Sequence, residues 1–289
     1  MGLFVAGAGY LGLAVAKEFA RTSEAPIWLA RRCTQSIDWS SLPPTVHPWP
    51  CDLLDPHLKL PPGPLSVVFA AGPAQQSLEA YEQVYVKALA NLLDTIDKRG
   101  HRLERLILVS STSVFEDIDG VVDESSPTRD DPKTRILLRA EALSREAKGI
   151  VFRLAGIYGP GRTRLIDLVL SGKARCHPSR PFGNRIHRDD AARAIVHLLR
   201  HRAPPPLVIG VDHAPVELCE VYRWIAKELG LPPPPMSDEA DERTKESLRM
   251  GARKRCSNAL LLSTGYRFVY PTYREGYGAL LKSQRQEIS

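Results

Sequence analysis

The sequence predicts an α/β fold with a doubly wound parallel sheet and a smaller C-terminal lobe. Two observations favour this fold class. A strand-like segment runs directly into a glycine-rich turn at the start of the chain, and apolar segments of strand length then alternate with helical patterns. A length of 289 residues suffices for one large α/β domain and a second lobe. We expect a first domain at 1–154 and a substrate lobe at 155–289, with some segments of the lobe returning to the first domain.

The glycine-rich turn at residues 3–12 reads Leu-Phe-Val-Ala-Gly-Ala-Gly-Tyr-Leu-Gly, which places G-x-G-x-x-G between a strand and a helix. Gly7 would let the chain reverse, Gly9 would let the backbone approach a pyrophosphate, and Gly12 would let the helix pack on the strand. The free amides and positive dipole end of the helix would face the phosphates. The predicted contacts with a dinucleotide come from Gly7, Gly9, Tyr10, Leu11 and Gly12. The sequence therefore predicts a Rossmann-type domain, the alternative being a glycine-rich turn in another α/β protein.

The composition is that of an ordinary globular protein, with 43% hydrophobic and 25% charged residues and a net charge of +6. The densest basic cluster, 249–255, is short and lacks aromatic residues, which argues against nucleic-acid binding. No apolar run reaches membrane-spanning length and the chain starts with a strand, so we expect a cytoplasmic protein without a membrane partner. The charged run 238–255 is expected to be an exposed helix, or a lid over the active site.

The five cysteines form no C-x-x-C pair and have no metal-ligand spacing. They occupy positions 33, 51, 176, 219 and 256. We therefore expect reduced thiols and no metal site.

The second predicted strand, 26–30, ends at Arg31-Arg32. At this place an acidic side chain would accept hydrogen bonds from ribose hydroxyls, whereas arginines pair with a 2′-phosphate. The chain has two arginines and no acid, which favours NADP over NAD. The alternative is that both guanidinium groups are solvated surface.

Three later segments place small or polar residues at predicted strand ends. Asp52 and Leu53 could hold the edge and the face of an adenine, although an Asp in a loop is often a turn former. Ala70, Ala71 and Gly72 would leave room for the cofactor to cross the sheet edge. The strand at 106–109 delivers four hydroxyls at 110–113. At least one of them would face the nicotinamide or the substrate, the alternative being turn and cap chemistry.

Several motifs follow one another in a characteristic order. They are the glycine turn, Ser-Ser-Thr-Ser-Val-Phe at 110–115, Val-Asp-Glu-Ser-Ser-Pro at 122–127, Arg-Leu-Ala-Gly-Ile-Tyr-Gly-Pro-Gly-Arg at 153–162 and Asn-Arg-Ile-His-Arg-Asp-Asp-Ala-Ala at 184–192. Their joint order resembles the extended short-chain dehydrogenases, and within them the atypical branch called NAD(P)-dependent epimerase/dehydratase-like. The segment 265–276 also resembles the end of that branch. The resemblance covers nearly the whole chain.

Of the four hydroxyls at 110–113, that of Ser110 is the predicted cofactor contact. The resemblance implies that Ser111 bonds the substrate oxygen. It also implies a tyrosine, which exchanges a proton with the substrate, and a lysine four residues later. Counted back from Glu141, these two positions hold Lys133 and Leu137, so both family residues are missing. An ordinary lysine, with a pKa near about 10.4, is a poor acid–base catalyst at neutral pH unless burial or neighbouring cations perturb it. Arg135 is such a neighbour, which makes Lys133 a candidate proton donor; a solvated lysine is the alternative.

Tyr158 and His187 are the other candidate catalytic residues, and a histidine titrates in the useful range. Thr112, Arg162 and Asn184 are the predicted substrate-binding residues. The region from 162 to 188 is rich in arginine, which suits a carboxylate or phosphate on a small substrate. Solvation of a helix and loops is the alternative explanation.

Two hypotheses about function follow. The first is an NADP-dependent oxidoreductase, or an epimerase or dehydratase, that moves a hydride to or from a small polar substrate. The second is a cofactor-binding protein without redox activity that works as a sensor, scaffold or binding partner, which the missing tyrosine and lysine favour. Members of the family often dimerise through helices that correspond here to 78–99 and 134–148, so the resemblance also allows a homodimer.

Overall fold

The computed structural model describes residues 2–35, 37–238 and 253–288. Most of the charged run at 238–255 lies outside these residues. The chain divides into two compact units: unit 1 contains 1–114, 129–153 and 191–208, and unit 2 contains 115–128, 154–190 and 209–289. Unit 2 therefore also takes the segment 115–128 from the predicted first domain, and 191–208 returns to unit 1.

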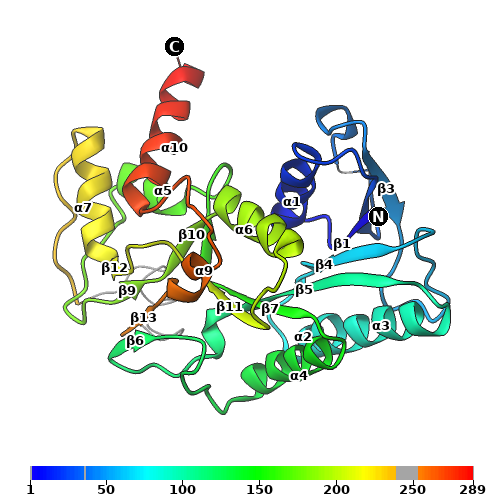
Figure 1. Cartoon of the computed structure of the whole chain (residues 1–289). Coiled ribbons are helices and arrows are strands. Elements are labelled where there is room, and N and C mark those ends of the chain that lie inside the picture. The colour runs from blue at the N-terminus through cyan, green and yellow to red at the C-terminus, as the bar shows by residue number, and fades with distance from the viewer. Residues whose placement is uncertain (1, 36, 239–252, 289) are drawn as a thin grey trace. The chain divides into compact units, whose positions relative to one another are not determined.

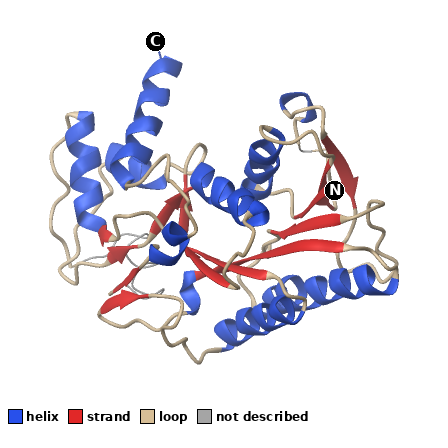
Figure 2. Ribbon diagram, viewed as in Figure 1, coloured by secondary structure: helices blue, strands red, loops and turns tan. Residues whose placement is uncertain are grey.

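Unit 1 is built on a seven-stranded sheet with the order β11-β7-β5-β4-β1-β2-β3 (Figures 1 and 2). The strands are β1 (Gly2–Ala6), β2 (Ile27–Arg31), β3 (Val46–Pro50), β4 (Leu65–Phe69), β5 (Leu103–Ser111), β7 (Ile150–Leu154) and β11 (Leu207–Gly210). Neighbours from β5 to β3 pair in parallel. The chain order reverses at β1, which pairs with β2 on one side and β4 on the other. This order is that of a doubly wound dinucleotide-binding sheet, so the predicted fold class is confirmed.

Helices cover both faces of this sheet, which explains why β1, β4 and β7 are buried along their whole length. The helices are α1 (Tyr10–Ala20), α2 (Leu78–Tyr81), α3 (Leu89–Lys98), α4 (Pro132–Glu146) and α6 (Arg188–Arg200). α1 and α6 lie on one face, and α2, α3 and α4 lie on the other (Figure 1). The core between them includes Phe4, Phe69 and Leu89.

A π-helix at Glu82–Ala88, η2, joins α2 to α3. The sequence predicts one regular helix over 78–99, and the structure differs at these seven residues. Apolar steps of three and four residues fit both helix forms over so short a stretch, so the pattern did not distinguish them.

Unit 2 consists of short strand pairs and helices. The strands are β6 (Gly120–Val122), β8 (Gly156–Tyr158), β9 (Phe182–Gly183), β10 (Arg185–His187), β12 (Val216–Glu217) and β13 (Lys254–Cys256), paired as β10-β8, β12-β9 and β13-β6. The helices are α5 (Arg164–Leu170), α7 (Leu218–Leu229), α9 (Ala259–Ser263) and α10 (Tyr273–Ile288). Their core includes Ile166, Tyr222 and Tyr273. Among the described residues, no helix of either unit is long and apolar enough to cross a membrane.

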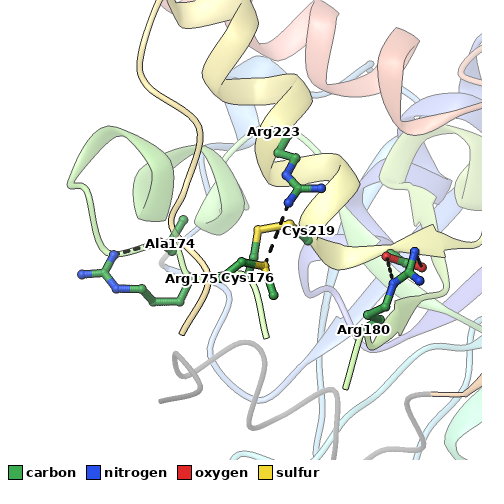
Figure 3. The surroundings of a disulfide bond; sticks show 8 residues. Ala174, Arg175, Cys176, Arg180, Cys219 and Arg223 are labelled. Atoms are coloured by element: carbon green, nitrogen blue, oxygen red, sulfur yellow. Dashed lines mark hydrogen bonds and ion pairs between the residues drawn. A yellow bond between two sulfur atoms is a disulfide. The ribbon is translucent and has the colours of Figure 1, made fainter. Parts of the chain in front are cut away.

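A disulfide joins Cys176 and Cys219 in unit 2 (Figure 3). Their Cα atoms are 5.0 Å apart, although 43 positions separate the two residues in sequence. The expectation of reduced thiols is therefore wrong for this pair, because the packing of the segment after α5 against α7 brings together cysteines whose sequence spacing gives no signal. Cys33, Cys51 and Cys256 remain thiols.

Candidate cofactor and active site

The turn between β1 and α1 has the backbone geometry that its glycines predict. Gly7 has a φ of +111°, a region that side-chain-bearing residues rarely adopt. A Cβ atom at Gly7 would lie 2.5 Å from the backbone nitrogen of Ala71, and one at Gly12 would lie 2.1 Å from the carbonyl oxygen of Gly7. The predicted roles of Gly7 in the turn and of Gly12 in helix packing are confirmed.

Gly9 caps α1, and a Cβ built on it would meet nothing within 4 Å. The space beside Gly9 is thus open at the amino end of a helix of 11 residues, where backbone amides and the helix dipole favour phosphate. Tyr10 and Leu11 form the first turn of this helix, and the Leu11 side chain is buried. Any phosphate contact at Leu11 would therefore come from its backbone.

Arg31 ends β2 next to the glycine turn. Its Nη1 atom donates to the carbonyl oxygen of Ala8 at 3.4 Å, and its side chain is exposed. Arg32 follows it and is also exposed. Both guanidinium groups are therefore accessible to a ligand, one of them against the turn that would hold the pyrophosphate.

The loop after β3 carries Asp52 and Leu53. One carboxylate oxygen of Asp52 accepts from the backbone nitrogen of Leu54 at 3.0 Å, which is the turn contact that the sequence analysis gave as an alternative. Asn91 on α3 fixes the same loop, because its amide nitrogen donates to the carbonyl oxygens of Leu53 and Asp55, each at 2.8 Å. The only sequence signal for Asn91 was an amide within a helical pattern, which does not reveal its partner.

Ala70, Ala71 and Gly72 follow β4, which neighbours β1 at the point where the strand order reverses. The close approach of Gly7 to Ala70 and Ala71 brings this loop against the glycine turn. The space around Gly72 is open, since a Cβ there would meet nothing within 4 Å. These three small residues line the sheet edge at which doubly wound folds bind ligands.

Ser110, near the end of β5, belongs to a buried polar network. Its hydroxyl donates to Glu141 of α4 at 2.7 Å. Arg153 of β7 holds the same carboxylate through both of its oxygens, at 2.9 and 2.7 Å. Glu141 is fully buried, so this bidentate pair compensates its charge. The Ser110 hydroxyl thus donates to a partner inside unit 1, and its oxygen keeps only acceptor capacity for the predicted contact with the cofactor.

Ser111 is half-buried at the end of β5, and its hydroxyl oxygen accepts from the backbone nitrogen of Ser113 at 3.1 Å. Its O–H can still donate, which keeps the predicted bond to a substrate oxygen feasible. Thr112 is buried in a 3₁₀ turn, η3 (Thr112–Val114).

The two α4 positions at which the family keeps its tyrosine and lysine hold other residues here, and these two residues have different surroundings. Leu137 is buried, with 2% of its surface exposed. Lys133 lies in the first turn, where its Nζ atom donates to Gln76 at 3.2 Å and lies 4.3 Å from the ring centroid of Tyr81. The predicted cationic neighbour of Lys133, Arg135, pairs with Asp130 at 2.6 Å.

His187 and Tyr158 both lie in unit 2, on the paired strands β10 and β8. Their ring centroids are 5.3 Å apart, and the His187 ring lies 3.9 Å from that of Tyr270. Only 1% of His187 is exposed, and this burial lowers its pKa despite the opposing effect of Asp189. Burial also raises the pKa of Tyr158, with Asp212 as the second cause. Both shifts favour neutral side chains.

Asp212 is a buried carboxyl group near Tyr158 that the sequence analysis did not single out. One of its oxygens accepts from the backbone nitrogen of Ala214 at 2.9 Å. Among the described residues, its other oxygen and the Tyr158 hydroxyl lack hydrogen-bond partners. Burial raises the pKa of Asp212 from 3.8 to about 7, against the opposing effect of Arg185.

Asn184 holds strand β13 through both ends of its amide. Its nitrogen donates to the carbonyl oxygen of Lys254 at 3.0 Å, and its oxygen accepts from the nitrogen of Cys256 at 2.7 Å. The amide keeps one N–H donor and one oxygen lone pair for the predicted substrate contact. Arg162 is exposed in the loop after β8. In the described parts of the chain, no group of three or more His, Cys, Asp or Glu side chains could hold a metal ion.

Comparisons with known proteins give relatives of the same architecture. No protein-family model matches the chain. Protein YeeZ of Escherichia coli K12 is 31% identical over 199 residues, which is 66% of this chain and 66% of YeeZ, just under two thirds of its length. A solved Methylobacillus flagellatus structure, assigned to the NAD-dependent epimerase/dehydratases, is 30% identical with a TM-score of 0.76 over 98% of both chains. The human epimerase family protein SDR39U1, solved with NADPH, is 19% identical with a TM-score of 0.75 over 96% of this chain and 97% of its own.

The reversal of strand order at β1 and the glycine turn at its end define a nucleotide-binding α/β protein of the Rossmann type. The full-length similarity to the Methylobacillus flagellatus structure narrows this class. The chain belongs to the NAD-dependent epimerase/dehydratase family, among the extended short-chain dehydrogenases, and the resemblance read from its motifs is confirmed.

Proposed function

We propose that this protein is an NADP-dependent oxidoreductase, or an epimerase or dehydratase that works through transient oxidation. It would move a hydride to or from a small polar substrate. The observation that carries the proposal is the open, amide-lined turn at Gly9 on the amino end of α1, with Arg31 against the same turn. The naming of the Methylobacillus flagellatus relative as NAD-dependent supports a nicotinamide cofactor.

The positive charges at the end of β2 are our reason for proposing NADP rather than NAD as the cofactor. Arg31 and Arg32 are both exposed where β2 ends, and no acidic residue stands at either position to accept bonds from ribose hydroxyls. Guanidinium groups bind phosphate with charge-assisted bonds. Titration of the purified protein with NADPH and with NADH tests the proposal. We expect measurable affinity for both cofactors and a preference for NADPH; no affinity for either would refute the assignment.

The arginines between 162 and 188 support an anionic group on the substrate, because guanidinium groups bind carboxylate and phosphate. Arg162 and Arg164 are exposed beside α5. We propose these two as the anchors of a carboxylate or phosphate. Turnover of paired substrates with and without the anionic group would test this, with loss of KM discrimination expected in the Arg162→Ala/Arg164→Ala variant.

The second candidate function, cofactor binding without redox chemistry, is favoured by Leu137, a buried apolar residue where the family keeps its catalytic lysine. Single-turnover oxidation of NADPH with a ketone panel and an imine panel separates the two functions. Oxidation with either panel supports the enzyme. Tight NADPH binding without oxidation in both panels supports a sensor or scaffold. A preference for imines is expected, because an imine can arrive already protonated, and a strong preference for ketones would contradict that expectation.

We also propose a cytoplasmic protein with a small-molecule substrate and the capacity to form a homodimer. The Cys176–Cys219 disulfide counts against this location, because disulfides are rare in cytosolic proteins. Fractionation of cells that contain the protein tests it, and recovery outside the cytoplasmic fraction would contradict it. Sedimentation of the purified protein tests the dimer.

A further inference from the structure

Three side chains of unit 1, Gln76, Tyr81 and Lys133, meet at one atom. The Tyr81 hydroxyl donates to Oε1 of Gln76 at 3.1 Å, and the Lys133 ammonium donates to the same oxygen at 3.2 Å. The ammonium also lies 4.3 Å from the centroid of the Tyr81 ring, in a cation–π contact. A single carbonyl oxygen thus receives one bond from a phenol and one from a cation. We call these three residues the Gln76 cluster.

The Gln76 cluster lies on the nicotinamide side of the predicted cofactor site. Gln76 is in the loop between β4 and α2, and Lys133 is in the first turn of α4, which packs on β5. A dinucleotide crosses the sheet edge where the strand order reverses, with one nucleotide over each half of the sheet. Under the proposed function, Arg31 at the end of β2 would bind the 2′-phosphate, which would place the adenosine half over β2 and β3. The nicotinamide half would therefore lie over β4 and β5. Gln76 is in the loop that follows β4, and Lys133 is on the helix that packs on β5.

Tyr81 is buried in a helix, whereas Gln76 is exposed in a loop. Tyr81 is the last residue of α2, is 8% exposed, and is followed at once by the π-helix η2, a form that often occurs at functional sites. Glu82, the first residue of η2, pairs with Arg139 of α4 at 2.9 Å and so ties the two helices together. Gln76 is exposed in an irregular loop. A substrate oxygen could therefore take the place of the amide oxygen without a change at Tyr81.

We propose that the amide oxygen of Gln76 marks the position of the reacting oxygen of the substrate, and that Tyr81 and Lys133 are the catalytic pair of this enzyme. This inference rests on the proposed function. When bound, the nicotinamide cofactor would supply the hydride that adds to the carbonyl carbon, and the π electrons of the C=O bond would move to oxygen. This oxygen takes the hydroxyl proton of Tyr81. Lys133 stabilises the resulting tyrosinate, which regains a proton from water, and the net reaction is carbonyl, NADPH and H⁺ to alcohol and NADP⁺.

The pair would replace the tyrosine and lysine that α4 lacks, with the same two functional groups supplied by two helices. Two hydrogen-bond donors on one oxygen stabilise the charge that develops there in the transition state.

Single-turnover oxidation of NADPH by 9,10-phenanthrenequinone tests the pair. Tyr81→Phe and Lys133→Met should each slow hydride transfer by about 100-fold or more, the usual contribution of a positioned general acid, with unchanged NADPH affinity. Tyr85→Phe is the matched control. Tyr85 lies on the same helical stretch with its ring centroid 5.5 Å from that of Tyr81, and its pKa is raised to about 12, chiefly by burial. The rate of hydride transfer should fall less in Lys133→Arg than in Lys133→Met, because arginine keeps the positive charge. Wild-type rates in Tyr81→Phe would overturn the proposal.

A measurement without substrate covers the case in which the quinone is not reduced. Lysines are methylated with ¹³C-formaldehyde, and the Lys133 resonance is identified by its absence in Lys133→Arg. NADPH should shift this resonance, whereas 2′-phospho-ADP-ribose, which lacks the nicotinamide, should leave it in place. Equal shifts with both ligands, or a shift with neither ligand while both bind, would overturn the proposal. If wild-type protein binds neither ligand, it is the proposed function that fails, and the catalytic pair fails with it.

Discussion

Gly9 and Gly12 belong to the same motif but have opposite surroundings. A methyl group at Gly12 would collide with the backbone of Gly7, whereas one at Gly9 would enter open space. Gly12→Ala should destabilise the fold by about 1–3 kcal/mol, the usual cost of overpacking. Gly9→Ala should keep its stability and lose NADPH affinity, because the added methyl group would occupy the proposed phosphate site. Urea unfolding and NADPH titration of both variants check this. Equal destabilisation by the two changes would contradict it.

Arg31 and Arg32 permit a specificity test. Changing both arginines to alanine should lower the affinity for NADPH by at least about tenfold, since each charge-assisted bond to a phosphate contributes about 1.5–3 kcal/mol. NADH affinity should stay the same, because NADH lacks the 2′-phosphate. Fluorescence titration with both cofactors measures the difference. An equal loss for NADH would show that the arginines serve the fold or the pyrophosphate instead.

Asp212 should make the stability of the protein depend on pH. Its carboxyl group is protonated in the folded state below about pH 7, whereas the unfolded chain loses this proton above pH 3.8. Unfolding therefore releases a proton between these values, and this contribution to stability is complete below pH 3.8 and is lost as the pH rises to about 7.

Asp212→Asn removes the charge without changing the shape. Wild-type protein should lose stability relative to this variant between pH 4 and pH 7, by a few degrees in Tm, and the difference should stay constant at higher pH. Thermal melts of both proteins at pH 4.5, 6 and 8 measure it. If the Tm difference between the two proteins did not change with pH, the raised pKa of buried Asp212 would be contradicted.

At the scale of elements, the disulfide ties the segment after α5 to α7. It closes a loop of 43 residues, for which the loss of chain entropy in the unfolded state predicts at most about 4 kcal/mol of stabilisation. The variant Cys176→Ser/Cys219→Ser should lose about 2–4 kcal/mol in urea unfolding and should no longer respond to reductant. Cys33→Ser is the control, because Cys33 is exposed and remains a thiol. If reductant did not change the free energy of unfolding of the wild-type protein, the predicted contribution of the disulfide to stability would be wrong.

The elements that sequence reasoning predicts well are those whose pattern is local. The strand, turn and helix of residues 2–20 are encoded by consecutive residues, and the apolar runs at 65–70 and 150–154 are buried strands as expected. The π-helix was missed because its apolar pattern matches that of an α-helix. The buried network of Ser110, Glu141 and Arg153 was missed because its members lie on three separate elements, so no local pattern connects them.

At the scale of the whole molecule, the fold class and family were predictable from the order of motifs along the chain. The candidate site was predictable only in part. Lys133 was singled out by its position in a motif, but Gln76, 57 residues away, becomes its partner only when α4 folds against α2. The disulfide likewise depends on the complete fold of unit 2. The position of a residue in a motif predicted that it would belong to the site. Only the tertiary packing shows which residues it contacts there.

The polypeptide passes between the two units several times, so the nucleotide-binding half cannot be released by a single cut. A fragment ending at residue 154 would lack 191–208, and with it most of α6 and the start of β11. Val151 would lose the bond that its backbone nitrogen donates to Pro206 at 2.9 Å, and β7 would become a bare sheet edge. We expect this fragment to aggregate, whereas a circularly permuted chain that retains 191–208 should stay monodisperse, as light scattering can show. A well-folded fragment would mean that the returning segment is dispensable; an aggregating one would mean that unit 1 is completed only by chain that lies beyond the first stretch of unit 2.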